Sequence, residues 1–196
     1  MRLSGAWGID LRCNYPNFFI KTPITEKPGK KTVYAIGDNF FKFLYRFIPQ
    51  NASSISAGRI EYIYDLVIKK HYADYMGRVF EQLCREYLFL YAEDMPILIS
   101  DIGQWWGTDS QRKKEVEIDI VGTPAEGNEY IIGSCKYRSE PIGVDELELL
   151  KEYADVFGKG EKYHYYIFSK GGFTNGLKEL AEKESVRLIS LEDMYM

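Results

Sequence analysis

Two neighbouring segments of the sequence place carboxylates and a lysine where they could act together. Glu117-Ile-Asp-Ile-Val-Gly122 and Tyr130-Ile-Ile-Gly-Ser-Cys-Lys136 both alternate apolar and polar residues, a pattern typical of strands with two different faces. Residues 123–129 between them include Pro, Gly and Asn, which favour a chain reversal. The two segments are therefore expected to form a β-hairpin.

Strict alternation also predicts which side chains share a face. Glu117 and Asp119 should lie on one face of the first strand, with Ile118 and Ile120 on the other. On the second strand, Ser134 and Lys136 should share a face. If the polar faces coincide, a carboxylate meets a lysine, and such a pair can hold a divalent metal beside an anion.

Composition excludes several other kinds of chemistry. The chain has 196 residues, of which 45% are hydrophobic, enough for one good-sized domain or a domain with a smaller module. Its three cysteines are far apart and it has only two histidines, which argues against a disulfide framework, a zinc site or a Ser-His-Asp triad. The net charge of −4 provides no general field for nucleic acid, so any DNA contact must come from a local patch.

The sequence lacks the features of a membrane protein. No apolar run approaches the roughly 18 residues needed to span a bilayer, and the first residues lack the apolar region of a signal peptide. We therefore expect a cytoplasmic protein without a membrane partner.

The elements after residue 73 predict an α/β fold. Apolar residues recur at helical spacing over residues 73–92 and 145–157, and a further helix is expected from 174 or 175 to 183. Strands are expected at residues 97–100, 163–169 and 186–190 beside the central hairpin. Residues 101–114, including Trp105 and Trp106, are interpreted as a loop that covers the core or stacks a base. This order predicts a mixed sheet with helices on both faces.

The first part of the chain is less regular. Residues 1–17 are expected to be irregular or disordered, and two extended stretches around a Lys-rich turn at residues 26–31 predict a hairpin like the wing of a winged helix. A solvated turn is an equal alternative. An aromatic helix follows at residues 40–48, capped near Asp38, and a small-residue connection at 51–58 marks the expected domain junction. We therefore predict a winged-helix remnant and N-terminus at residues 1–50 and the main domain at 51–196.

The element order, with Asp119 on the second strand and Lys136 on the third, resembles the PD-(D/E)XK nuclease superfamily. The resemblance implies a restriction-endonuclease-like fold in which Asp119 and an acid two residues before the lysine bind Mg²⁺, while Lys136 orients or activates the attacking water. Such metal ions polarise the phosphoryl group, and a cation offsets the charge of the transition state. Glu81, on the helix of residues 73–92, matches a further acidic position of that pattern, although an ordinary boundary glutamate is the alternative.

The sequence departs from this pattern at Ser134, where the motif has a glutamate. A neutral hydroxyl is a weak metal ligand, so catalysis is expected to be weak or lost unless another acid compensates. Glu117 is one candidate for this, and Glu146 and Glu148 on the next predicted helix are others, because the superfamily relocates its conserved acid. A gain of activity in Ser134→Glu would indicate a site that lacks only this ligand.

A closer resemblance extends over roughly residues 18–195. The segments that carry it are Lys21-Thr-Pro-Ile-Thr-Glu-Lys-Pro-Gly-Lys-Lys31, Tyr34-x-Ile-x-Asp38-x-Phe-Phe-x-Phe43, Gly77-x-x-Phe-Glu81-x-x-Cys-Arg-Glu86, Trp105-Trp-Gly107, Glu117-Ile-Asp-Ile-Val121, Gly133-x-Cys-Lys136 and Phe168-Ser-Lys-x-Gly-Phe173. They look like the C-terminal region of archaeal AAA+-type ATPases, in which a winged helix and a nuclease-like domain of unassigned function follow the ATPase module. No phosphate-binding loop of the Gly-x-x-x-x-Gly-Lys-Ser/Thr type occurs here, so no ATP site is expected.

Two classes of function remain open. The first is a Mg²⁺-dependent nuclease, active or degenerate, that acts on or binds DNA through Asp119, Lys136, Glu81 and Ser134, with Asp119, Glu81 and Glu117 as metal ligands. The second is a non-catalytic interaction or assembly module for an ATPase partner or for further copies of itself. A Ser134–Lys136 nucleophile pair is disfavoured, because residues two apart on a strand lie about 6.5–7 Å from each other.

Overall fold

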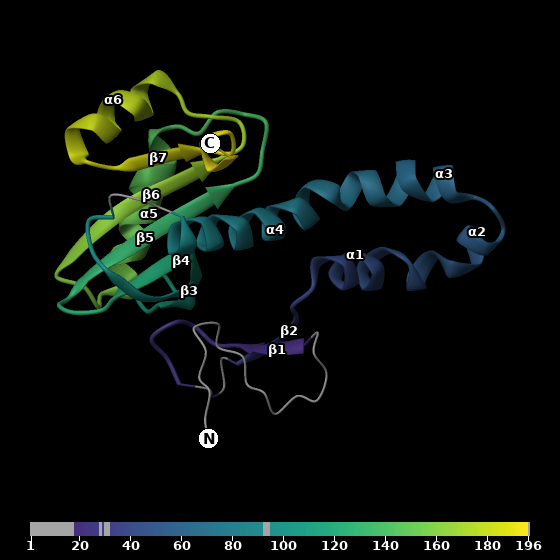
Figure 1. Cartoon of the computed structure of the whole chain (residues 1–196), viewed down its shortest axis with the longest axis horizontal. Coiled ribbons are helices and arrows are strands. Elements are labelled where there is room, and N and C mark those ends of the chain that lie inside the picture. Colours follow the sequence, from purple (N-terminus) through teal and green to yellow (C-terminus); the bar gives the residue numbers. More distant parts are fainter. Residues whose placement is uncertain (1–17, 28, 30–31, 92–94, 196) are drawn as a thin grey trace. The chain divides into compact units, whose positions relative to one another are not determined.

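The computed structural model describes residues 18–27, 29, 32–91 and 95–195 (Figure 1). The chain divides into two compact units, the first formed by residues 1–22 and 28–79 and the second by residues 23–27 and 80–196. The expected irregular N-terminus and two lysines of the predicted wing, Lys30 and Lys31, lie outside the described residues. The predicted domain boundary at residues 50 and 51 falls within the first unit and stays a prediction.

The first unit contains a small hairpin and a series of helices. Strands β1 (Phe18–Lys21) and β2 (Val33–Ile36) pair antiparallel, as the sequence predicts, whereas a winged-helix role for them stays a prediction. Asp38 caps the aromatic helix α1 by accepting a 3.1 Å hydrogen bond from Phe41 N–H. The helical elements are α1 (Asn39–Phe47), η1 (Pro49–Asn51), α2 (Ala52–Ser56), α3 (Ile60–Ile63), the π-helical turn η2 (Tyr64–Ile68) and the start of α4 (Lys69–Leu90). Residues 51–58, expected to be a connection, are thus largely helical.

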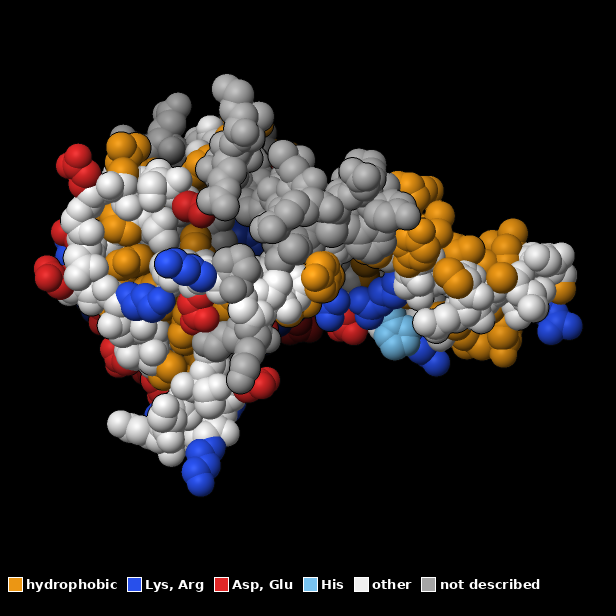
Figure 2. Space-filling model, turned by 90° about the horizontal axis from the view of Figure 1, so that it is seen from below, with side chains coloured by type: hydrophobic (Ala, Val, Ile, Leu, Met, Phe, Trp, Pro, Cys, Tyr) orange, Lys and Arg blue, Asp and Glu red, His pale blue; other side chains and the backbone are white. Residues whose placement is uncertain are grey.

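Few apolar side chains of this unit are buried. Among its described residues, only Phe47 and Ile63 belong to the buried hydrophobic set. Hydrophobic side chains gather on the surface of α1, α2 and α3 (Figure 2). The large exposed ones are Val33, Tyr34, Phe40, Tyr45, Ile48, Ile60, Tyr62, Tyr64, Leu66 and Tyr72. Among the described residues of the first unit, large hydrophobic side chains are therefore exposed more often than buried.

The second unit is built on a mixed five-stranded sheet in the order β3-β4-β5-β6-β7 (Figure 1). Its strands are β3 (Ile99–Asp109), β4 (Lys114–Pro124), β5 (Glu129–Lys136), β6 (Lys162–Ser169) and β7 (Arg187–Ser190). The first three strands pair antiparallel, and β5, β6 and β7 pair parallel through the crossover helices α5 (Val144–Phe157) and α6 (Asn175–Glu184). A short helical turn, η3 (Asp193–Tyr195), follows β7. The predicted α/β class, with a mixed sheet flanked by helices, is confirmed.

Two separate cores cover the two faces of the sheet. On one face, here called the α5 face, Leu147, Leu150 and Ala154 of α5 and Leu177 of α6 pack against Ile132 and Ile167 of the strands. On the other, the α4 face, Phe80, Cys84 and Leu88 of α4 pack against Ile131 and Phe168. Successive residues of β5 thus point into different cores, as expected for a sheet covered on both sides.

The tryptophan pair lies in a strand and not in the expected loop. Trp105 and Trp106 belong to β3, where Trp105 is 5% exposed and its ring meets Phe157 edge-to-face at 5.4 Å. Trp105 is therefore a core residue of the α5 face. The interpretation of residues 101–114 as a loop was wrong for the segment that contains the two tryptophans. Among the described residues, no helix is long and apolar enough to cross a membrane.

A β-bulge interrupts the alternation of β4. Gly103 pairs with Val121 and Trp105 with Ile118, so β4 uses one residue more than β3 between these two pairs. As a result, Ile118 packs in the core of the α5 face and Ile120 in that of the α4 face. The prediction that these two isoleucines share a face is wrong, because strict alternation does not survive the extra residue. Asp119 lies at the bulge.

Candidate active site

The bulged segment places the Asp119 side chain against the end of β5. Asp119 Oδ2 accepts a 2.8 Å hydrogen bond from Cys135 N–H and lies 3.5 Å from Ser134 Oγ. A backbone donor holds this carboxylate in one position on the neighbouring strand, as is needed for a group that binds a ligand. The sequence predicted that Asp119, Ser134 and Lys136 would meet, and the structure brings these three residues together.

Glu146 completes the cluster from helix α5. It lies in the first turn of that helix and is 8% exposed. Ser134 Oγ donates a 2.7 Å hydrogen bond to Glu146 Oε1, and Lys136 Nζ lies 3.1 Å from the same oxygen. An acid from the next helix thus contacts the serine that stands in place of the motif's glutamate.

Helical spacing explains why Glu146 and not Glu148 enters the site. Glu146 precedes Leu150 by four residues, so the two side chains share the helix face that packs on the sheet. Glu148 lies on the exposed side of the helix. The sequence offered both as candidates, and the periodicity of the apolar stripe is the signal that could have chosen between them.

Burial and neighbouring charges set the electrostatics of the cluster. Burial by itself would lower the pKa of Lys136, but attraction by Asp119 and Glu146 outweighs it, and the pKa of Lys136 is raised above its usual value. Burial also raises the pKa of Asp119, and the charge of Lys136 and the hydrogen bond from Cys135 oppose that change only in part. Lys136 is therefore a cation at neutral pH, and burial disfavours the charged form of Asp119.

Arg85 supports the bulge from the α4 face. Its Nη1 donates a 2.7 Å hydrogen bond to the backbone carbonyl of Asp119, and its side chain is only 13% exposed. Glu81 Oε2 lies 3.9 Å from the same nitrogen, one helical turn earlier. Glu81 is thus linked to the bulge through Arg85. Sequence reasoning gave Arg85 no role, although its spacing four residues after Glu81 was a signal.

Glu117 lies outside the cluster. Its side chain is exposed and accepts a hydrogen bond from the Gln104 amide, while its charge adds to the rise in the Asp119 pKa. Within the described part of the chain, no three His, Cys, Asp or Glu side chains are grouped closely enough to hold a metal ion. The metal-ligand roles predicted for Asp119, Glu81 and Glu117 therefore stay predictions, and the two acids at Ser134 are Asp119 and Glu146.

Comparison with solved structures finds three partial likenesses. The Vibrio cholerae protein VC1899 is 21% identical, with a TM-score of 0.47 over 61% of this chain and 31% of that one. A repair endonuclease from Pyrococcus abyssi is 21% identical, with a TM-score of 0.32 over 45% of this chain and 38% of that one. EndoMS, in a complex with double-stranded DNA, is 20% identical, with a TM-score of 0.34 over 57% of this chain and 44% of that one.

Comparison of sequences gives a relative and a family. An uncharacterised protein of Methanocaldococcus jannaschii is 30% identical over 178 residues, which are 88% of this chain and 37% of that protein. This chain therefore spans well under half the length of that relative. Residues 44–149 match the DUF234 family, described as archaeal and bacterial proteins of unknown function. Because this match covers more than half of the chain, the protein belongs to the DUF234 family.

Proposed function

We propose that the second unit is a Mg²⁺-dependent phosphodiesterase domain of the nuclease type that acts on DNA. One observation carries this proposal. Glu146 reaches Ser134 and Lys136 from helix α5, so the site regains the acid that β5 lacks. The acidic metal ligand that the motif has at position 134 would then be moved to Glu146 and not lost.

The donor set fits a magnesium ion. Two carboxylates, Asp119 and Glu146, lie near one hydroxyl, and Mg²⁺ is commonly held by one or two carboxylates together with water and substrate phosphates. The raised pKa of Asp119 reflects a buried negative charge, which a cation would stabilise. When bound, Mg²⁺ supplies Lewis acidity toward the phosphoryl oxygen and lowers the pKa of coordinated water.

The protein groups then have separate roles. Asp119 and Glu146 would hold the cation, and Ser134 orients Glu146 by donating a hydrogen bond to it. Lys136 stays protonated and is therefore unsuited to act as a general base. Its ammonium group instead offsets negative charge on the phosphate and donates hydrogen bonds that orient the attacking water.

DNA is the proposed substrate because the resemblance to PD-(D/E)XK nucleases implies it. Local cations at the carboxyl ends of β5 and β6 could contact the phosphates despite the net charge of −4. Lys170 is exposed there, its backbone N–H donates to Lys136 O at 3.1 Å, and its Nζ lies 4.5 Å from the centre of the Tyr137 ring. Binding through these groups should weaken steeply as salt increases.

The experiment is a DNA-cleavage assay with Mg²⁺ or Mn²⁺ that compares two glutamates of the same helix. Glu146→Gln keeps the shape and a hydrogen-bond acceptor but removes the charge, and Glu148→Gln removes an exposed charge two residues away. We expect metal-dependent cleavage by the wild type and by Glu148→Gln, with loss in Glu146→Gln and in Asp119→Asn. Absence of cleavage by the wild type at high protein concentration would refute the active enzyme.

The second candidate function is a non-catalytic interaction module. The large exposed apolar side chains of the first unit favour it, because few of that unit's described hydrophobic residues are buried. We propose an ATPase, or a further copy of this chain, as the partner. Association that persists in Asp119→Asn and Glu146→Gln but is lost when Phe40 and Tyr45 are replaced by serine would support this function. Association that survives the serine substitutions would exclude this surface.

A further inference from the structure

Two cysteine thiols meet in the core of the α4 face, and the proposed mechanism uses neither of them. Cys84 of α4 is 0% exposed and Cys135 of β5 is 8% exposed, and both cysteines are free. They belong to the same buried cluster, and a hydrogen bond joins their thiols. Two thiols in contact on neighbouring elements are the starting geometry for a disulfide.

The two cysteines lie directly behind Asp119. The backbone N–H of Cys135 donates the 2.8 Å hydrogen bond to Asp119 Oδ2. Cys84 precedes Arg85, whose Nη1 donates the 2.7 Å hydrogen bond to the carbonyl oxygen of Asp119. A covalent bond between the sulfurs brings α4 and β5 closer together than a hydrogen bond between thiols does. A disulfide here would therefore move both donors relative to Asp119.

Burial protects the thiols while the core is closed. It raises the pKa of Cys135 well above its usual value, the hydrogen bond with Cys84 adds to this rise, and the charge of Arg85 opposes it in part. Because the thiolate is the reactive form, few oxidants attack such a thiol. An oxidant that enters a closed core must be small and uncharged, and hydrogen peroxide has both properties. Cys135 is the more exposed of the pair and is the thiol that peroxide meets first.

We propose that hydrogen peroxide links Cys84 to Cys135, and that this disulfide displaces the backbone donor of Asp119 and inactivates the carboxylate cluster. The Cys135 thiolate attacks one peroxide oxygen, the O–O bond breaks, and one water leaves after protonation, with a sulfenic acid remaining on the sulfur. The Cys84 sulfur then attacks the sulfenic sulfur, the S–O bond breaks, and the hydroxyl leaves with the thiol proton as a second water. Two electrons thus pass from the thiols to the peroxide, and a dithiol reductant restores both thiols.

The two parts of this proposal have different foundations. The loss of cleavage rests on the proposed nuclease function, because it needs an active enzyme to inhibit. Formation of the disulfide and its effect on the Cys135 amide depend only on the contacts of the two cysteines with each other and with Asp119. Each part therefore has a measurement of its own.

The test treats the full chain with hydrogen peroxide and compares it before and after reduction by dithiothreitol. Cys13 lies outside the described residues and is replaced by serine throughout, so that it cannot pair with either thiol. Peptide mass spectrometry should find Cys84 linked to Cys135. Hydrogen exchange of the Cys135 amide, followed by NMR, should become at least about tenfold faster, the factor that corresponds to one hydrogen bond to a charged group. DNA cleavage should fall by at least about the same factor, and dithiothreitol should reverse all three changes.

A variant without the partner thiol is the matched control. Cys84→Ala in the same background keeps Cys135 and its backbone donor but cannot form the bond, so peroxide should leave its amide exchange and its cleavage unchanged. Thermal unfolding of each variant checks the fold. Cys84→Ser, which nearly keeps the volume of the side chain, replaces Cys84→Ala if the smaller residue is unstable.

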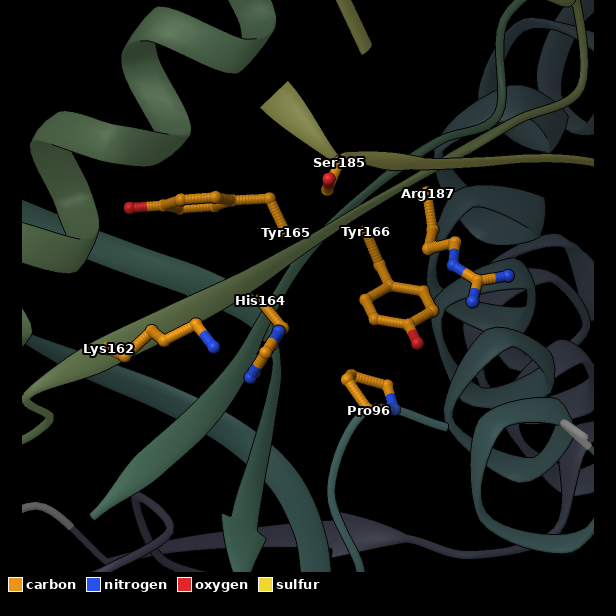
Figure 3. A pocket seen from close by; sticks show the side chains of 7 residues that line it. All are labelled: Pro96, Lys162, His164, Tyr165, Tyr166, Ser185 and Arg187. Atoms are coloured by element: carbon orange, nitrogen blue, oxygen red, sulfur yellow. The ribbon is translucent and has the colours of Figure 1, made fainter. Parts of the chain in front are cut away.

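A methionine near the same core provides an internal measure of the oxidant. Met95 packs against the thiol cluster, and its Sδ lies 3.8 Å from the hydroxyl of Tyr166. Figure 3 shows that hydroxyl on the side of Pro96, the residue after Met95. Methionine sulfoxide is restored by reductase enzymes and a disulfide by dithiols, so recovery in dithiothreitol assigns the effect to the thiols.

Three results would overturn the proposal. The first is the absence of a link between Cys84 and Cys135 after peroxide has already oxidised Met95. The second is a linked protein whose Cys135 amide exchanges as slowly as in the reduced form. The third is equal loss of cleavage in Cys84→Ala. A reduced protein that cleaves no DNA would refute the proposed nuclease function, and the mass and exchange measurements would still decide whether the disulfide forms and displaces the donor of Asp119.

Discussion

Moving the glutamate from position 146 to position 134 tests whether the acidic metal ligand has been relocated to Glu146 or has been lost. From the sequence, Ser134→Glu alone is expected to complete the site. The contact of 2.7 Å between Ser134 Oγ and Glu146 Oε1 changes this expectation, because a glutamate at 134 would meet an acid already in place. We therefore predict that Ser134→Glu and Glu146→Ser each impair the protein, and that the double variant recovers.

The expected magnitudes follow from these contacts. Two like charges about 4 Å apart repel by about 4 kcal/mol at an effective dielectric constant near 20, and Lys136 at 3.1 Å from Glu146 offsets part of this. Ser134 is only 4% exposed, so the additional atoms of a glutamate there should cost a further amount of about 1–3 kcal/mol through overpacking. Ser134→Glu should thus lower the free energy of unfolding by about 2–4 kcal/mol. Glu146→Ser should lower it by about 2–3 kcal/mol, through loss of a charged hydrogen bond and an ion pair.

The double variant has one acid and one serine again, so the two costs should not add. We expect a coupling free energy of about 2–4 kcal/mol from chemical denaturation of the four proteins in the cycle. Metal-dependent DNA cleavage should be lost in both single variants and return to within about tenfold of the wild type in the double variant. Additive destabilisation, or a Ser134→Glu protein that is as stable as the wild type and more active, would refute the relocation.

Three further predictions concern other parts of the second unit. Arg85→Lys keeps the charge but loses the geometry that holds Asp119 O, so we expect a loss of about 1–2 kcal/mol in denaturation and about tenfold in cleavage. A Cβ on Gly171 would lie 2.5 Å from the backbone oxygen of Ser139, so Gly171→Ala should cost about 1–3 kcal/mol, whereas Gly176→Ala, whose nearest neighbour would be 3.8 Å away, should be neutral or stabilising in thermal unfolding. Burial, with a smaller effect of nearby acidic and tyrosine side chains, raises the pKa of Tyr165 to about 12. Because the unfolded chain ionises this hydroxyl near pH 10 and the folded chain only near pH 12, the free energy of unfolding should fall as pH rises from 10 toward 12. Tyr165→Phe should remove that part of the pH dependence.

Each of these has an outcome that contradicts it. Unchanged stability and cleavage in Arg85→Lys would show that the bulge does not depend on the guanidinium. Equal melting temperatures for the two alanine variants would show that the loop at Ser139 can move away from residue 171. A difference in tyrosinate absorbance between wild type and Tyr165→Phe that is already complete at pH 11 would contradict the raised pKa.

The helices and the sheet were predictable because their signals are long and periodic. The apolar stripes predicted along residues 73–92 and 145–157 remain recognisable if either end is shifted by one residue, and the structure has helices there, α4 (Lys69–Leu90) and α5 (Val144–Phe157). Strand β3 was not recognised at Trp105, because Gly103, Gln104, Gly107 and Thr108 weaken the alternating pattern around it. Pairing with β4, a contact distant along the chain, decides its conformation.

The candidate site was predictable in its residues and not in its geometry. The sequence indicated Asp119, Ser134 and Lys136, and it offered Glu146 among several acids. The bulge leaves no trace in the pattern, because Ile118 and Ile120 are apolar and each finds a core, one on either face of the sheet. Only the register of β3 against β4 reveals the additional residue, and that register is a property of the folded chain.

Because Glu146 lies on helix α5 and not on a strand, the geometry of this site is sensitive to how that helix packs on the sheet. Strand residues are fixed by the hydrogen-bond ladder of the sheet, whereas Glu146 is positioned by the packing of Leu147, Leu150 and Ala154 below it. A change of volume in that apolar layer moves the helix as a body and alters the spacing between the two carboxylates. If the site binds the proposed cation, its metal affinity can therefore change through substitutions deep in the core, with every residue of the site itself unchanged.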